Sequence, residues 1–344
     1  MMRIVAAFCV LWLLGLAAGV RAEPVQHWSV GLHRMQFADP LDARPVQALA
    51  FYPSSGPERS SRIDGYRVEA FEGAPVVIGR YPLLMLSHGN TGSPLALHDL
   101  ATALARRGFV VVAVTHPGDN AHDHSRLGTL SNLYGRPLQI SAAITTSLAD
   151  PFLAPYIRGE RVGVIGYSAG GETALILSGA HPDLERLHRY CQEHPRDSDA
   201  CKTNGVLIAD RADLAAEADP RVHALLLMAP LSLMFGRQAL AQVKVPALIY
   251  SGDNDQLLSI EKNAQALARK LPVTPNYRLL AGAGHFVFMA PCDEEQRHHM
   301  AALCNDPDGV DREDIHLSLQ AEAAHFFART LGRPRRVGLD TADQ

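Results

Sequence analysis

Short runs of continuously apolar residues, each followed by a stretch with helical character, recur along most of the chain. Such runs are typical of strands covered on both faces. Strands that alternate with helices form a parallel sheet with helices on both sides. We predict such strands at residues 83–87, 109–115, 161–167, 222–228, 247–250 and 277–280. The pattern therefore predicts a doubly wound, mostly parallel α/β fold.

The segments between these strands carry the helical signals. Ser93 precedes a proline, which is typical of a helix start, and we expect that helix to end at Gly108. Further helices are expected at residues 137–152, 170–177, 259–271 and 312–331. Near the N-terminus, residues 30–37 and 46–52 are strand-like runs separated by turn residues, which predicts an antiparallel hairpin at a sheet edge.

Neither an internal repeat nor an interdomain linker interrupts this pattern. We therefore expect residues 23–344 to form a single domain. One segment, residues 181–220, is polar, charged and too long for an ordinary connection between a helix and a strand. We interpret it as a small cap-like insertion on the same domain.

The first residues have the features of an export signal. Arg3 supplies a positive charge, residues 4–20 are apolar or small, and small residues flank a cleavage position after Ala22. We expect residues 1–22 to be a cleaved signal peptide and the protein to be exported, either periplasmic or secreted. Because the apolar run is slightly long, an uncleaved membrane anchor is the alternative. After cleavage, no stable membrane span is expected.

The cysteines fit an exported chain. Of the 5 cysteines, Cys9 lies inside the expected signal peptide, and the others are Cys191, Cys201, Cys292 and Cys304. An even number of cysteines in an exported protein indicates disulfides, and nearness favours Cys191–Cys201 and Cys292–Cys304. Free, buried thiols are the alternative. No Cys-x-x-Cys pair is present, which argues against zinc or thioredoxin chemistry.

Residues 166–170, Gly-Tyr-Ser-Ala-Gly, have the form G-x-S-x-G. They follow a predicted buried strand and open a predicted helix, which is the setting of a nucleophile elbow. Such a turn forces the serine into a strained backbone conformation, and the flanking glycines let strand and helix approach closely. We therefore predict that Ser168 is a nucleophile. A plain glycine-rich turn is the alternative.

A serine hydroxyl is a weak nucleophile and needs a base. His285 follows the last predicted strand in a glycine-rich stretch, which suits a loop that reaches back over the sheet, and we predict it as the general base. Two aspartates, Asp253 and Asp255, follow the strand at 247–250. We prefer Asp255 as the acid that orients the base, because it reaches past the turn, and expect Asp253 to be a turn residue that accepts a hydrogen bond from its own turn's backbone.

The tetrahedral intermediate of acyl transfer needs main-chain amides that stabilise its oxyanion. One donor is expected from the residue after the nucleophile, Ala169. The second should come from the loop after an earlier strand, where the sequence has His88, Gly89 and Asn90. We predict the amides of Ala169 and Asn90 as the oxyanion hole.

Two polar stretches could suggest a metal, but their spacing does not support one. The histidines and aspartates within residues 116–124 match no zinc motif, and we expect a solvated loop near the mouth of the site. The aspartates within residues 306–311 lack the bidentate ligand of a calcium loop and are also expected to be solvated. No metal and no other cofactor is predicted.

Composition excludes some partners. The chain is 47% hydrophobic and 20% charged, which is typical of a globular protein. Its formal net charge is −4, and it has no run of lysines or arginines. Nucleic acid is therefore not an expected partner.

The predicted nucleophile turn, the loop at residues 88–90, Asp255 and His285 together resemble the α/β-hydrolase superfamily. More closely, the chain resembles the bacterial dienelactone-hydrolase-like proteins related to platelet-activating-factor acetylhydrolase. The resemblance lies in residues 37–40, 44–45, 51–53, 86–89, 115–118, 166–171, 284–286 and 292. It implies cofactor-free hydrolysis of a small-molecule or lipid-like ester. True dienelactone hydrolases use a cysteine nucleophile, whereas this chain has Ser168, so the resemblance does not imply the dienelactone substrate.

The residues thus predict a carboxylic-ester hydrolase that works through an acyl-enzyme intermediate. A serine peptidase or amidase on the same fold is an alternative, ranked lower because no acidic pair or arginine for a peptide terminus stands out. A non-catalytic binding protein that kept the fold is an alternative of another class. A complete set of triad candidates argues against it.

Overall fold

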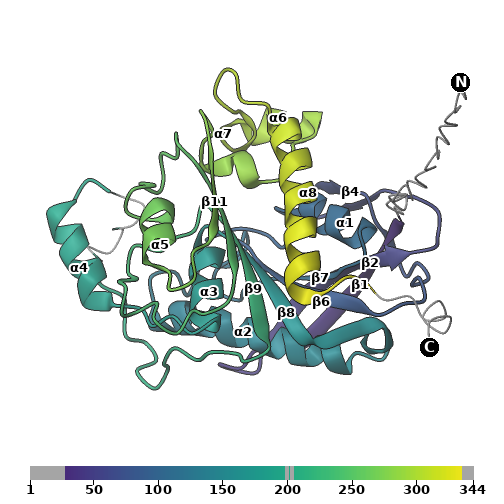
Figure 1. Cartoon of the computed structure of the whole chain (residues 1–344), viewed down its shortest axis with the longest axis horizontal. Helices are drawn as coiled ribbons and strands as arrows, with labels where there is room; N and C mark the ends of the chain where they lie inside the picture. Colours follow the sequence, from purple (N-terminus) through teal and green to yellow (C-terminus); the bar gives the residue numbers. More distant parts are fainter. Residues whose placement is uncertain (1–27, 198–200, 202–204, 335–344) are drawn as a thin grey trace, which may run out of the picture.

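The structure is a computed structural model that describes residues 28–197, 201 and 205–334. The predicted signal peptide lies outside these residues. In the described part, nine strands form one sheet with helices on both faces (Figure 1). The doubly wound α/β fold predicted from the sequence is therefore confirmed. None of the helices in this part is long and apolar enough to cross a membrane.

The centre of the sheet is parallel. Its strands are β6 (Tyr81–Ser87), β7 (Val110–Val114), β8 (Ile157–Tyr167), β9 (Val222–Met228), β10 (Ala247–Gly252) and β11 (Asn276–Leu280). They lie in the order β7-β6-β8-β9-β10-β11, and each neighbouring pair is parallel. Every residue of β6, β7 and β10 is buried, as the continuous apolar runs predict. The carboxyl ends of these strands therefore meet along one edge.

The predicted antiparallel hairpin extends this sheet. Its strands β1 (Ser29–Ala38) and β2 (Pro45–Ser54) pair antiparallel along their whole length, and β2 joins the sheet next to β7. The short strand β5 (Phe71–Glu72) lies outside β1 and forms the outermost position. Two more short strands, β3 (Ser61–Ile63) and β4 (Tyr66–Val68), make a separate hairpin.

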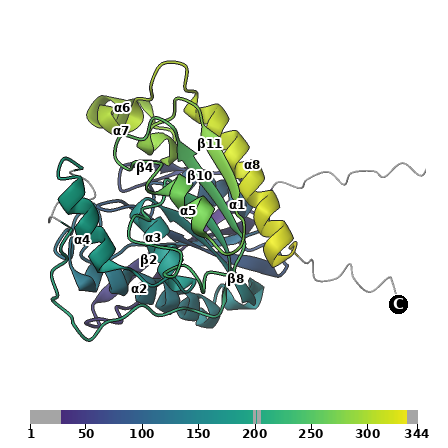
Figure 2. The same ribbon diagram turned by 60° about the vertical axis from the view of Figure 1, so that its left-hand side comes forward.

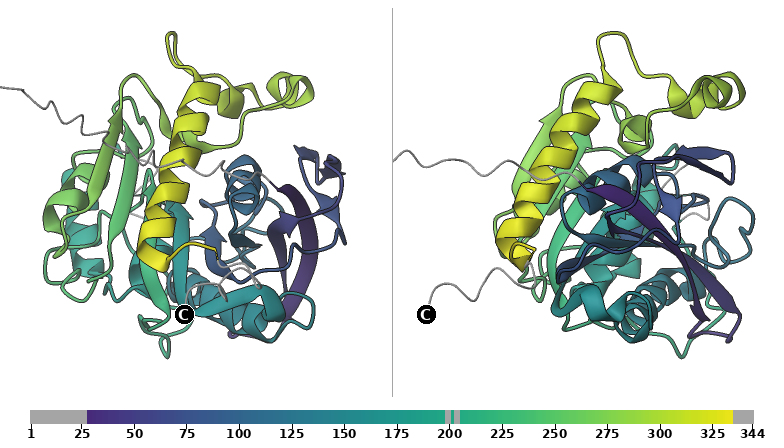
Figure 3. Two further views of the ribbon diagram at one scale, coloured as in Figure 1. Left: turned by 45° about the vertical axis from the view of Figure 1, so that its right-hand side comes forward. Right: turned by 90° about the vertical axis from the view of Figure 1, so that its right-hand side faces the viewer.

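The helices divide between the two faces of the sheet (Figures 2 and 3). On one face lie α1 (His98–Arg106) and α8 (Arg312–Leu331), whose leucines and phenylalanines share one hydrophobic cluster. On the other lie α2 (Leu130–Ala149), α3 (Ala169–Leu177) and α5 (Ala264–Lys270), which share a second cluster. The sheet thus has an apolar core on each side.

Three helix starts differ from the prediction. The helix expected to begin after Ser93 is α1, which begins at His98, because Ser93 Oγ accepts the Leu95 amide in a separate turn, 3.1 Å away. The helix expected from residue 137 is α2, which begins at Leu130, because Thr129 caps it and Pro137 lies inside. The helix expected from residue 259 is α5, and it begins only at Ala264.

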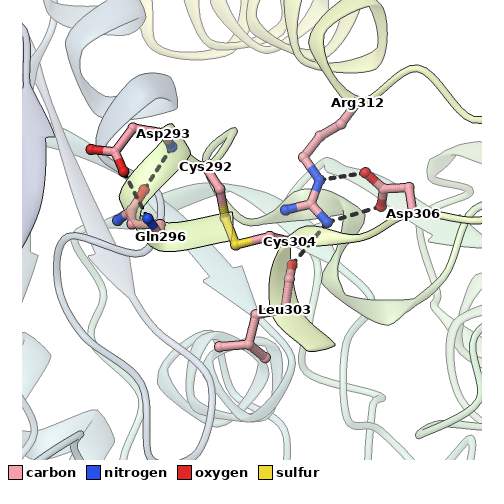
Figure 4. Close-up of a disulfide and its surroundings, with 7 residues drawn as sticks. All are labelled: Cys292, Asp293, Gln296, Leu303, Cys304, Asp306 and Arg312. Atoms are coloured by element: carbon pink, nitrogen blue, oxygen red, sulfur yellow. Dashed lines mark hydrogen bonds and ion pairs between the residues drawn. A yellow bond between two sulfur atoms is a disulfide. The ribbon is translucent and has the colours of Figure 1, made fainter. Parts of the chain in front are cut away.

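Two segments leave the sheet, and each holds a cysteine pair. The polar insertion at residues 181–220 carries α4 (Leu184–Glu193), and Cys191 bonds to Cys201. The second segment lies between the 3-10 helix η2 (His285–Phe288) and α8. It carries α6 (Glu294–His299) and α7 (Ala301–Cys304), and Cys292 bonds to Cys304 (Figure 4). The structure therefore places both predicted cysteine pairs at disulfide distance.

Candidate active site

Ser168 stands at the turn from β8 into α3. Its φ of 54° and ψ of −118° lie in a strained region for a residue with a side chain. The turn is tight: a Cβ on Gly166 would lie 2.3 Å from the Gly170 carbonyl oxygen, and one on Gly170 would lie 1.9 Å from the Ser87 carbonyl oxygen. Only glycine fits at these two positions. The serine hydroxyl is thereby held at the carboxyl edge of the sheet.

His285 begins η2, on the loop after β11, and it contacts Asp255. Its Nδ1 lies 2.8 Å from Asp255 Oδ2, and the two side chains are only 5% and 1% exposed. The other carboxylate oxygen of Asp255, Oδ1, accepts the amides of Leu257 and Leu258, at 3.0 and 2.9 Å. This carboxylate is therefore fixed from both sides and can orient the imidazole through Nδ1.

Tyr167 links His285 to the turn at Ser168. Its ring lies 5.3 Å from the His285 ring, centroid to centroid, and its hydroxyl donates to the His285 carbonyl oxygen at 3.2 Å. Within the described residues, no hydrogen bond joins Ser168 Oγ to the imidazole. Bonds between nucleophile and base are often long in substrate-free sites and tighten when substrate binds. The structure thus pairs His285 with Asp255 and places Tyr167, the residue before Ser168, in contact with His285.

Asp253 has a different partner. Its Oδ1 accepts the Gly282 amide at 2.6 Å, and its own amide donates to the Leu280 carbonyl oxygen at 3.1 Å. It therefore joins the loop after β10 to the loop that carries His285. The expected hydrogen bond to its own turn is replaced by this bond across the two loops.

The loop after β6 passes beside Ser168. A Cβ on Gly89 would lie 3.1 Å from Ser168 Cβ, so the chain there approaches Ser168 closely. Asn90 follows and is exposed, and within the described residues its main-chain amide donates no hydrogen bond. Ala169, which the sequence predicts as the other donor, directly follows Ser168 and begins α3.

A buried ion pair holds this loop in place. Arg136 of α2 and Asp119 form a pair at 2.7 Å, and their side chains are 3% and 0% exposed. Asp119 Oδ1 accepts the Thr91 amide at 2.7 Å, and Arg136 Nη2 donates to the His88 carbonyl oxygen. The pair therefore fixes the main chain on both sides of Asn90.

Two buried histidines complete the support. Burial, followed by the Arg136 charge, lowers the pKa of His88 to about 4 and that of His116 well below its ordinary value. Both rings are therefore neutral. His88 Nδ1 donates to the Gly89 carbonyl oxygen and Nε2 accepts the His116 amide. His116 Nδ1 donates to Gln139 and Nε2 accepts from Ser87 Oγ. Each neutral ring thus has one donor and one acceptor partner.

The prediction of a solvated loop at residues 116–124 is wrong for its first half. His116 and Asp119 are completely buried because Arg136 and Gln139 of α2 supply their partners. The sequence offered one signal for this network, since Arg136 is the one charged residue within residues 130–149. At the second polar stretch, Asp306 pairs with Arg312 at 2.8 Å. In the described part of the chain, no group of histidine, cysteine or acidic residues could hold a metal ion.

The sheet order and the tight strand-to-helix turn at Ser168 are those of the α/β-hydrolase fold. The chain is similar to the solved structure of a ferulic acid esterase from Streptomyces cinnamoneus, with a TM-score of 0.61 and 19% identity over 94% of this chain and 96% of the other. No protein-family model matches the sequence, and no curated protein matches it. The structural likeness supports the fold of the superfamily, and the closer resemblance to dienelactone-hydrolase-like proteins stays a prediction.

Proposed function

We propose that the chain is a serine hydrolase of carboxylic esters. The observation that carries this proposal is the bond between His285 and Asp255 beside a serine in a strained strand-to-helix turn. A buried carboxylate on Nδ1 leaves Nε2 as the basic nitrogen, which is the tautomer that a serine nucleophile requires. The likeness to a ferulic acid esterase supports an ester as substrate.

In this proposal, Ser168 Oγ attacks the ester carbonyl carbon while His285 Nε2 takes its proton. The amides of Ala169 and Asn90 donate to the oxyanion of the tetrahedral intermediate. His285 then returns the proton to the departing alcohol, which leaves an acyl group on Ser168. A water molecule, activated by the same imidazole, attacks the acyl-enzyme and frees the serine. The chain's own residues supply every step, so we propose that no cofactor takes part.

The remaining predictions fit this proposal. We propose that residues 1–22 are a signal peptide and that the mature protein is exported, since its cysteines lie at disulfide distance. The substrate is proposed to be a small-molecule or lipid-like ester. A panel of nitrophenyl esters, lysophospholipid-type esters and aminoacyl amides tests the bond cleaved. Turnover of esters well above amides supports the proposal, whereas turnover of amides alone would make the protein an amidase.

Mild reduction is expected to lower ester hydrolysis before the protein unfolds. Cys292 and Cys304 are partly exposed, whereas Cys191 and Cys201 are only 4% and 8% exposed, so the first pair should open first. That bond closes a loop of 12 residues just after His285, and such a closure stabilises a fold by roughly 3 kcal/mol. Ester hydrolysis and circular dichroism are followed together as reductant is added.

Thiol alkylation and peptide mapping identify the open pair in the same samples. A variant with serine at Cys292 and Cys304 should reproduce the reduced activity, and the matched variant at Cys191 and Cys201 is the control. Full activity with Cys292 and Cys304 alkylated would contradict the expectation.

A further inference from the structure

A pair of side chains, His316 and Asp99, supports the loop that carries His285. His316 of α8 is 2% exposed, and its Nδ1 lies 2.5 Å from Asp99 Oδ2 of α1. Its Nε2 lies 2.7 Å from the carbonyl oxygen of Val287, which is in η2, two residues after His285. The packing of α1 beside α8 brings these groups together (Figures 1 and 2).

The partners of His316 determine its protonation. A carboxylate and a carbonyl oxygen both accept hydrogen bonds, so both ring nitrogens must donate, and only an imidazolium has two N–H groups. Burial, the largest influence, lowers the pKa of His316. The Asp99 charge and the two hydrogen bonds outweigh burial, so the pKa lies above the ordinary value of 6.5. The Asp99 carboxylate also accepts from Gln320 Nε2 at 2.9 Å, which fixes it further.

The other charged groups around His316 come from each neighbouring element. His98 of α1 is partly buried, and its pKa is lowered chiefly by that burial, with His316 adding to the lowering. Arg312 of α8 opposes the charge on His316 and is held by Asp306 at 2.8 Å (Figure 4). On η2 the nearest titratable group is His285 itself. Asp99 is therefore the anion that faces the ring.

A second contact anchors the same loop to α1. The Ala290 amide, just after η2, donates to the carbonyl oxygen of Ala96, just before α1, at 2.8 Å. The Ala290 contact joins the chain after His285 directly to the start of α1, and the Val287 contact joins it to His316 of α8, which in turn contacts Asp99 of α1. If the imidazolium loses a proton, the ring keeps one N–H and can donate to only one of its two acceptors.

We propose that Asp99 and His316 are positioning residues that hold η2, and through it His285, in reach of Ser168. This inference rests on the proposed function. Deprotonation of His316 releases one of its two bonds. Because the pKa of His316 is raised in the folded protein, its support is complete below 6.5 and is lost as pH rises through the raised value. Ester hydrolysis should therefore have an alkaline limb set by a residue that does not touch the substrate.

The test compares the full chain with Asp99→Asn, His316→Gln and, as a matched control on an exposed position of α8, His325→Gln. Two kinds of measurement are made across neutral and alkaline pH. One is kcat and KM for a nitrophenyl ester. The other is the hydrogen-exchange protection factor of the peptide containing residues 284–290, which does not depend on activity.

Without the Asp99 charge, burial dominates and the pKa of His316 falls. Asp99→Asn should therefore move the alkaline limb and the loss of protection to lower pH together. His316→Gln should lower kcat by about 10- to 100-fold at neutral pH with little change in KM, because the base is misplaced. His325→Gln should match the unchanged protein. If His316→Gln fails to fold, Asp99→Asn and the titration of the unchanged protein still decide the matter.

An alkaline midpoint and a protection profile that are the same with and without Asp99→Asn would overturn the inference. A chain that hydrolyses no ester would instead overturn the proposed function, and the protection factors would still show whether His316 holds η2. The two failures are therefore distinguishable.

Discussion

Replacing Ser168 with alanine is expected to lower kcat for ester hydrolysis by about 10⁵- to 10⁶-fold, because the acyl-enzyme can no longer form. The remaining rate should come from the amide donors and from substrate binding alone. Folding should be unaffected, since alanine fills the same strained turn with one atom fewer. Steady-state hydrolysis of a nitrophenyl ester gives the rate, and thermal unfolding checks the fold.

Ser232→Ala is the matched control for this variant. Ser232 is buried on the loop beside the turn at Ser168, and its hydroxyl oxygen has no hydrogen-bond partner in the described part of the protein. Its removal should change kcat by less than about 3-fold, as expected of a side chain outside the reacting set. Equal activity in Ser168→Ala and the unchanged chain would show that another residue is the nucleophile.

Replacing each of the two aspartates after β10 with asparagine should lower kcat to very different extents. Asp255→Asn is expected to lower kcat by about 10³- to 10⁴-fold, because an amide facing Nδ1 no longer stabilises the imidazolium or fixes the tautomer. Asp253→Asn should cost less than about 10-fold, because the asparagine oxygen still accepts the Gly282 amide. Both variants keep the shape of the side chain. Their kcat values, measured with one ester, therefore compare two roles at matched size.

A larger loss of kcat in Asp253→Asn than in Asp255→Asn would assign the orienting role to Asp253. It would also mean that the loop rearranges when substrate binds. Equal, small losses would indicate that the His285–Asp255 contact is structural.

The sheet could be predicted because its signals are local. Val110–Val114 is an uninterrupted apolar run and Val222–Met228 is apolar apart from His223, which is the pattern of strands that are covered on both faces of a sheet. Ser168, His285 and Asp255 could be proposed because each follows a strand that ends at the same edge. The serine needs small neighbours, and Gly166 and Gly170 are visible in the sequence.

The groups that support the site could not be predicted, because their partners lie far away in sequence. His316 meets Asp99 across 217 residues, and Arg136 meets the His88 carbonyl oxygen across 48. A histidine in an amphipathic helix gives no sign that a carboxylate will face it. Pro137 misled the prediction of α2 in a different way: a proline favours a helix start, but Thr129 caps the helix, which therefore begins at Leu130, about two turns earlier.

The central claim is that Ser168 is a nucleophile activated by His285. Its most direct test is reaction of the folded protein with a fluorophosphonate, followed by peptide mapping of the adduct. We expect one phosphonyl group per chain, on Ser168, formed at a rate that falls strongly in His285→Ala and is unchanged in Ser232→Ala. A folded chain that hydrolyses esters but carries the label elsewhere, or carries none, would contradict the account.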